Sequence, residues 1–198
     1  MELTTKKKNM DTIWEELSIS NDFLFGKVMQ DAELCKELLQ RILPHLKIER
    51  IAYPELQKTI NPDFDAKSIR LDVYVKDEKG TVYDIKMQVI DTKELPKRTR
   101  YYQSIIDLQL IDKGELYSKL KPCFIIFICP FDPFGKGRHV YTFENICKED
   151  NTVSLNDGTT KIFLNANGTE KDCRQELQVF LDYITGKKSE DPFIQKLE

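Results

Sequence analysis

The sequence predicts an α/β fold in which a small mixed sheet carries helices on its faces. Three patterns indicate this fold: two alternating segments within residues 69–90 joined by a turn, a continuous apolar run over residues 123–129, and segments of helical period on either side of the hairpin. Strand-like and helix-like segments in this order pack most simply as helices against a sheet. With 198 residues, of which 40% are hydrophobic, the chain is long enough for one domain with a sizeable core.

The first expected element is a helix that faces the core. Asn21 and Asp22 are residue types that cap helix starts, and Pro44 ends the segment. Between them, the apolar positions form one stripe: Phe25, Val28, Met29, Ala32, Leu38, Leu39, Ile42 and Leu43.

A β-hairpin follows this helix. Residues 69–76 alternate between apolar and polar side chains, and residues 81–90 do the same. The segment Asp77-Glu78-Lys79-Gly80 suits a type I turn that closes into a glycine bulge. Such a turn pairs Asp77 with Thr81 and so fixes the register of the whole ladder.

This register gathers polar side chains on one face of the hairpin. The opposed pairs that it predicts are Asp72 with Lys86, Tyr74 with Asp84, and Arg70 with Gln88. The resulting cluster consists of Asp72, Asp84, Lys86 and Gln88.

The remaining elements complete a sheet with helices on its faces. Residues 95–111 have helical period and end at Lys113-Gly114, and the run from Cys123 to Cys129 is typical of a central strand covered on both faces. Residues 139–143 and 161–164 are expected to add short strands, and residues 175–184 a closing helix. We expect an N-terminal extension over residues 1–17, one domain over 18–186 and a polar tail over 187–198, where a longer helical region could be cut short.

Composition restricts the partners and the compartment. The net charge of -3 gives no overall attraction to nucleic acid, so any contact with DNA must come from a local basic surface. The longest apolar run is too short to span a bilayer, and no signal peptide is recognisable, so we expect a cytoplasmic protein without membrane contact.

Cysteine and histidine spacing gives no zinc motif. The five cysteines are widely spaced without a CxxC pair, which favours reduced thiols over a disulfide framework or a zinc site. His45 and His139 are the only histidines and lie far apart in the sequence, so neither receives a role at this stage.

The polar cluster of the hairpin has two interpretations from its residues alone. Hydrolysis of a phosphodiester needs oxygen ligands for Mg²⁺ or Mn²⁺ and a polar group that orients the attacking water, and opposed strands can supply both. A solvent-exposed hairpin face with an ordinary ion pair between Asp72 and Lys86 would give the same pattern.

Several motifs, in a fixed order, resemble those of the PD-(D/E)XK nuclease family transposases, relatives of the recombination-promoting nucleases. The matching blocks span most of residues 18–198: Ser20-Asn-Asp-Phe-Leu-Phe25, Arg70-Leu-Asp-Val-Tyr-Val-Lys-Asp77, Tyr83-Asp-Ile-Lys-Met-Gln88, Arg98-x-x-Tyr-Tyr102, Gly114-x-x-Tyr117, Cys129-Pro-Phe-Asp-Pro-Phe-Gly135 and Tyr141-Thr-Phe-Glu-Asn145. The resemblance implies a restriction-endonuclease-like αβββαβ core with extra C-terminal strands and a helix. It also implies a Mg²⁺ or Mn²⁺ site and DNA as substrate in recombination or mobile-element biology. A double-strand cut would suit a homodimer.

The resemblance assigns roles within the hairpin, with one departure. Asp72 corresponds to the first metal-binding acid, and Gln88 to the residue that replaces the usual lysine. Where the family has Ile-Glu-Met-Gln, this chain has Ile85-Lys-Met-Gln88, so Lys86 stands in place of the second acid.

Two hypotheses for Lys86 remain open. In one, Asp84-Ile85-Lys86 is a shifted D-x-K signature in which Asp84 binds the metal and Lys86 orients water. In the other, which we favour, Lys86 pairs with Asp72, repels the ion and leaves a weak or inactive nuclease. A catalytically inactive DNA-binding or interaction module is the alternative from another functional class.

Five further residues are candidate contacts for a nucleic-acid backbone. They supply cations or a stacking ring after the hairpin and in a glycine-containing loop: Arg98, Arg100, Tyr102, Lys136 and Arg138. Asp22 lies in a matching block, yet a helix cap explains it equally well.

Overall fold

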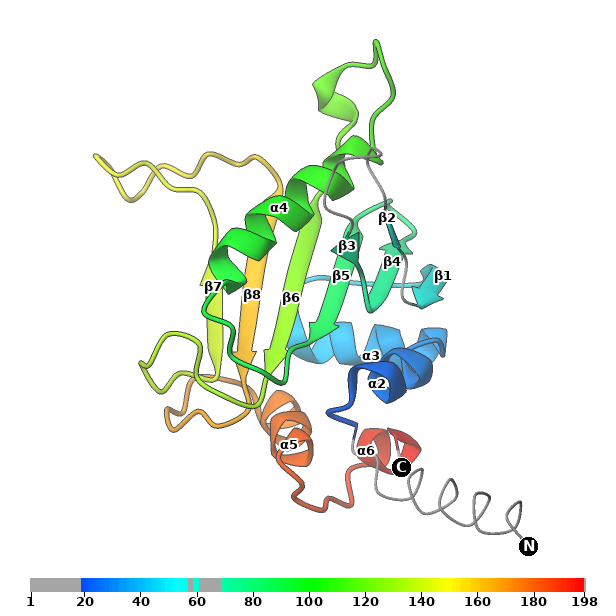
Figure 1. The fold of residues 1–198 in the computed structure, drawn as a ribbon, viewed down its shortest axis with the longest axis vertical. Helices are drawn as coiled ribbons and strands as arrows, with labels where there is room; N and C mark the ends of the chain where they lie inside the picture. Colours follow the sequence, from blue (N-terminus) through cyan, green and yellow to red (C-terminus); the bar gives the residue numbers. More distant parts are fainter. Residues whose placement is uncertain (1–18, 57–58, 61–68, 198) are drawn as a thin grey trace, which may run out of the picture.

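The structure, a computed structural model, describes residues 19–56, 59–60 and 69–197 and has a sheet with helices on both faces (Figure 1). Its elements in chain order are α2 (Asp22–Val28), α3 (Ala32–Ile42), β1 (Ile51–Leu56), β2 (Thr59–Ile60), β3 (Ile69–Arg70), β4 (Val73–Asp77), β5 (Val82–Met87), α4 (Leu95–Leu108), η1 (Tyr117–Lys119), β6 (Cys123–Cys129), β7 (Val140–Phe143), β8 (Thr159–Asn165), α5 (Gln175–Ile184) and α6 (Pro192–Leu197). The predicted fold class is confirmed.

The main sheet has six strands in the order β1-β4-β5-β6-β8-β7. Strands β5, β6 and β8 run parallel, whereas the pairs β1–β4, β4–β5 and β7–β8 are antiparallel. Every residue of β6 is buried, as predicted for an apolar run in the interior of a sheet.

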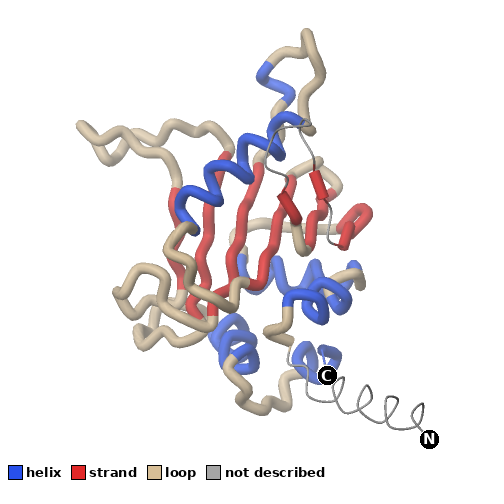
Figure 2. The backbone as a smooth tube through the Cα atoms, viewed as in Figure 1, coloured by secondary structure: helices blue, strands red, loops and turns tan. Residues whose placement is uncertain are grey.

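Helices cover the two faces unequally. Helices α2, α3, α5 and α6 contribute side chains to one apolar cluster with one face of the sheet, and α4 contributes to a second cluster on the opposite face. Figure 2 shows α4 as a single helix running diagonally across the strands, away from the other four. The polar face of the hairpin therefore lies beneath α4 and not in solvent.

The predicted hairpin and its register are confirmed. Val73 pairs with Ile85 and Tyr74 with Asp84, which is the alignment that the turn imposes. In that turn the Gly80 amide donates to the Asp77 carbonyl at 3.0 Å, and Gly80 has a φ of 81°, where glycine is strongly preferred.

The prediction of one helix over residues 22–43 is wrong, because two helices occupy this range. Asn21 caps α2 through its side-chain oxygen, while Asp31 caps α3 by accepting from the amides of Glu33 and Leu34. The apolar stripe continues across the break, which explains why periodicity alone suggests one helix.

The first hairpin strand is also shorter than predicted. It divides into β3 and β4, and β3 leaves the main sheet to pair with β2. Arg70 therefore lies opposite Thr59, and its predicted pairing with Gln88 is wrong.

The segment expected as a polar tail packs against the domain. Residues 192–197 form α6, whose Phe193, Ile194 and Leu197 side chains are buried in the core. Arg41 of α3 lies over the Phe193 ring at 4.5 Å and binds the Asp191 carboxylate at 2.8 Å. The expected N-terminal extension, residues 1–17, lies outside the described residues. Among the residues that the structure describes, no helix is long and apolar enough to cross a bilayer.

Candidate functional site

A cluster of charged side chains is buried between the hairpin and α4. Only 1% of Asp72, none of Asp84 and 9% of Lys86 is exposed. An ordinary solvent-exposed ion pair, the simpler of the two interpretations from sequence, does not describe this cluster. Charges in such a position lose their hydration and are tolerated only with partners or after a pKa shift.

Lys86 occupies the position opposite Asp72, as the hairpin register predicts. Its ammonium nitrogen lies 2.6 Å from Asp72 Oδ1, and the lysine side chain is only 11% exposed. Removal of one partner from a buried pair of this kind typically costs about 3–5 kcal/mol, since it leaves the other charge uncompensated. The pair therefore holds the centre of the cluster together.

Asp84 is buried without a hydrogen-bond partner. Within the described part of the chain, neither of its carboxylate oxygens makes a hydrogen bond. The pKa of Asp84 is raised to about 8, mainly because the group is buried; the charge of Lys86 lowers this pKa, Asp72 raises it and Arg98 lowers it, and about 8 is the net result. At neutral pH the group is therefore mainly a neutral carboxylic acid.

Gln88 lies directly after β5, and both ends of its side-chain amide are occupied. Its Nε2 donates to the Ile90 carbonyl, and its Oε1 accepts from Arg98 Nη1 at 2.7 Å. One N–H of Nε2 and one lone pair of Oε1 remain to orient a water molecule.

Arg98 connects α4 to the end of β5. Besides Gln88, its guanidinium binds the Tyr102 hydroxyl at 3.0 Å and lies 5.6 Å from the centre of the Phe127 ring. Arg98 and Tyr102 stand one helical turn apart, so the spacing of the motif Arg98-x-x-Tyr-Tyr102 has a structural explanation. These two predicted DNA contacts are engaged inside the protein.

The other three predicted DNA contacts lie on the surface. Arg100 is exposed on α4, and Lys136 and Arg138 are exposed in the loop that follows β6. Asp132 organises this loop by accepting from the Gly135 and Gly137 amides. Because β5 and β6 are parallel, the loop lies at the same end of the strands as Gln88, the carboxyl end (Figure 1).

Asp22 stands at the start of α2. From the sequence, a helix cap and a role in the site explain this residue equally well. It is exposed, and its carboxylate accepts from the Phe23 amide. Asn21 is the cap itself.

As it stands, the hairpin cluster does not suit a resident divalent metal ion. Mg²⁺ and Mn²⁺ prefer several oxygen ligands, often charged carboxylates. Here the Asp72 carboxylate is held by an ammonium group, and the raised pKa of Asp84 keeps its proton at neutral pH. Among the described residues, the one group of three or more His, Cys, Asp or Glu side chains arranged to hold an ion lies elsewhere, at His139, Asp172 and Cys173.

The comparisons agree with the motifs. A family model described as PD-(D/E)XK nuclease family transposase matches residues 20–191, which is most of the chain. No curated protein and no solved structure matches the chain. The predicted family is confirmed, and the mixed six-stranded sheet flanked by helices is consistent with a restriction-endonuclease-like fold.

Replacing Asp84 with Asn should stabilise the protein increasingly as the pH rises from 5 to 8. The folded state keeps the Asp84 proton up to a pKa of about 8, whereas the ordinary value is 3.8. Between these values the stability of the unaltered protein falls with rising pH, by at most about 1.4 kcal/mol per unit, and the amide removes this loss. Urea unfolding across that pH range measures the effect; a difference between the two proteins that does not change with pH would contradict a buried neutral acid.

The Arg98→Ala variant should lose about 2–3 kcal/mol of unfolding free energy, because two charge-assisted hydrogen bonds and a ring contact disappear. The matched control is Arg100→Ala, two positions along the same helix on an exposed side chain, which should stay within about 0.5 kcal/mol. Denaturant midpoints measure both variants. Equal effects at the two positions would show that Arg98 does not anchor α4.

Proposed function

We propose that this chain, which belongs to the PD-(D/E)XK nuclease family transposases, acts on DNA and that its Lys86–Asp72 ion pair holds phosphodiester hydrolysis at a low level. The family gives a nuclease-like function, and nucleases of this superfamily generally use divalent metal ions. The observation that carries the proposal is the 2.6 Å contact between Lys86 Nζ and Asp72 Oδ1.

The charge of the cluster supports suppression. The family resemblance places a glutamate where this chain has Lys86, so the charge at that position differs by two units. With Asp72 neutralised by the ammonium and Asp84 protonated, little negative charge is left for a divalent cation. The cluster lacks both a ligand and the electrostatic attraction that such an ion needs.

One observation favours an active enzyme instead. Asp84 has a carboxylate without a hydrogen-bond partner among the described residues, and a cation would supply that partner. Asp84 and Lys86 would then act as a D-x-K signature, with the lysine near the attacking water. Against this reading, Asp84 lies opposite Tyr74, and Lys86 is already bound to Asp72.

Plasmid cleavage in Mg²⁺ or Mn²⁺ separates these readings. We expect no strong cleavage from the protein as it is, cleavage by Lys86→Glu, and none by Lys86→Glu combined with Asp72→Ala, because the first change restores a second acid opposite Asp72. Mg²⁺ should also raise the melting temperature of the Lys86→Glu variant and leave the unaltered protein unchanged.

Each other outcome has a defined meaning. Strong cleavage by the unaltered protein that Asp84→Asn abolishes would overturn suppression and establish Asp84 as a ligand. If no variant cuts and none is stabilised by Mg²⁺, although all remain folded by circular dichroism, the proposed nuclease role fails and DNA binding alone remains.

DNA binding should depend on the exposed cations of α4 and of the loop that follows β6. Lys136→Ala and Arg100→Ala should each weaken binding to any DNA sequence and reduce the slope of log affinity against log salt by about one, since each removes one phosphate contact. Fluorescence anisotropy with a labelled duplex in EDTA measures this without cleavage. Lys119→Ala serves as control, because Lys119 lies in η1 before β6, at the opposite end of that strand from Lys136, and binds Glu115; an equal loss there would contradict a local DNA surface.

A further inference from the structure

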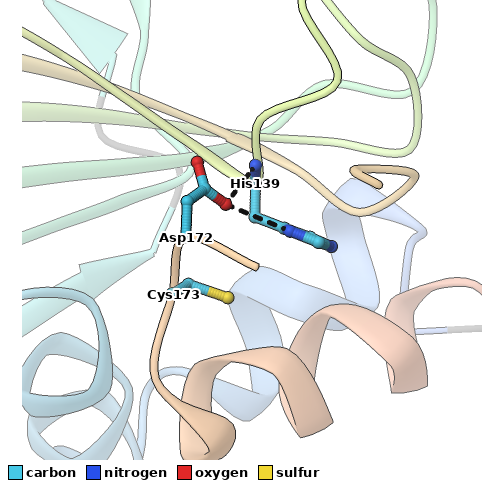
Figure 3. Close-up of side chains that lie close together, drawn as sticks. All are labelled: His139, Asp172 and Cys173. Carbon is cyan, nitrogen blue, oxygen red and sulfur yellow. Dashed lines mark hydrogen bonds and ion pairs between the residues drawn. The ribbon is translucent and has the colours of Figure 1, made fainter. Parts of the chain in front are cut away.

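We propose that His139, Asp172 and Cys173 form a site for one divalent transition-metal ion such as Zn²⁺, separate from the hairpin cluster (Figure 3). The possible ligand atoms of these three side chains all lie within 4.8 Å of one another. The inference does not depend on the proposed nuclease function.

The fold brings together residues that are distant in the sequence. His139 directly precedes β7, while Asp172 and Cys173 lie between β8 and α5. Pairing of β7 with β8 fixes the position of His139, whose carbonyl accepts from the Asn165 amide at 2.9 Å. Asp172 then reaches back and accepts from the His139 amide, also at 2.9 Å.

The distances are close to those of a tetrahedral zinc site. Zinc bonds of about 2.0–2.3 Å place neighbouring ligand atoms about 3.3–3.7 Å apart. His139 Nδ1 and Asp172 Oδ1 are 3.2 Å apart, near this range. The Cys173 sulfur lies within 4.8 Å of one possible ligand atom of each of the other two residues, so a movement of roughly 1 Å, within the reach of a side-chain torsion, completes three ligands. The fourth position is left for water or another ligand.

The absence of a side chain at Gly168 leaves room for the imidazole of His139. A Cβ atom at this position would lie 2.6 Å from His139 Cγ and Cδ2, so any side chain larger than glycine would collide with the ring. The Nδ1 atom of the ring faces Asp172 (Figure 3). His139 and Cys173 also line a surface hollow of about 650 Å³, which gives an ion a route of entry.

The chemistry of the three ligands selects a particular class of ion. Imidazole and thiolate suit Zn²⁺ and its neighbours, whereas Mg²⁺ prefers oxygen ligands alone. A thiolate and a carboxylate together would balance the charge of the ion. In the ion-free protein the Cys173 thiol donates to Gln178 Oε1 at 3.5 Å and would give up its proton on binding.

Arg138 competes with the ion for Asp172. Its Nε lies 3.2 Å from Asp172 Oδ2, and its side chain is 56% exposed and able to turn into solvent. Removal of this cation takes away both a competitor and a repulsive charge. A site that binds metal should therefore respond to Arg138 in a way that a purely structural His139–Asp172 hydrogen bond would not.

Titration of the tag-free full chain with Co²⁺, followed by absorption, tests the site. We expect one equivalent to bind and to give a thiolate-to-cobalt charge-transfer band, which Zn²⁺ then removes. Cys173→Ser should abolish the band and His139→Gln should weaken binding at least about tenfold. The matched control is Cys147→Ser: Cys147 and Cys173 are the two cysteines that are not buried, and only the second lies at the site.

The proposal would be overturned if the unaltered protein gave no charge-transfer band, or if the band survived Cys173→Ser. Loss of the band in Cys147→Ser would likewise locate the ion elsewhere. Arg138→Gln should tighten Co²⁺ binding several-fold; an unchanged or weaker affinity would contradict Asp172 as a ligand. Circular dichroism in EDTA shows that each variant is folded before metal is added.

Discussion

The register of the β4–β5 hairpin is the constraint on which the candidate site depends. A glycine bulge at Gly80 sets Tyr74 opposite Asp84 and brings the Lys86 ammonium to Asp72. A slip of one residue would exchange the two faces of a strand, placing its polar side chains in the larger apolar cluster. The same strand β5 pairs in parallel with the buried β6, so the hairpin also aligns the cluster with the centre of the sheet.

Covering this hairpin with α4 makes the polar cluster energetically demanding. Tyr74 and Val82 on the covered face pack into apolar surroundings, but Asp72, Asp84 and Lys86 share that face. A structure selected for stability alone would place apolar side chains there, since a buried ion pair seldom outperforms them and an unpartnered acid is unfavourable. The cluster therefore favours a functional explanation over a structural one, and Arg98 is part of its support.

Local signals in the sequence predict much of this fold. The Asp77–Gly80 turn, the continuous run of β6 and the period of α5 depend on neighbouring residues, and the structure confirms all three. The predictions that were wrong concern segments placed by distant contacts. Strand β3 pairs with β2 and not with β5, and α6, expected as a polar tail, is held by Arg41 of α3. Burial of the polar face could not be read from alternation, because alternation does not specify what covers each face.

The same limit explains why His139 received no role from the sequence. Spacing rules detect metal ligands that lie close along the chain, whereas Asp172 and Cys173 reach His139 only after β7 has paired with β8. Because β7 is antiparallel to β8, His139 stands beside the carboxyl end of β8, and Lys86 lies near the carboxyl end of β5. The long loops over residues 109–122 and 144–158 project from the opposite end of the strands, the amino ends of β6 and β8 (Figure 2). They expose the apolar side chains of Leu116 and Leu155. In an open α/β sheet, binding groups gather beyond the carboxyl ends of the parallel strands, where loops bring in distant residues. The His139 cluster and the Lys86–Gln88 part of the hairpin cluster both lie toward that end of the sheet.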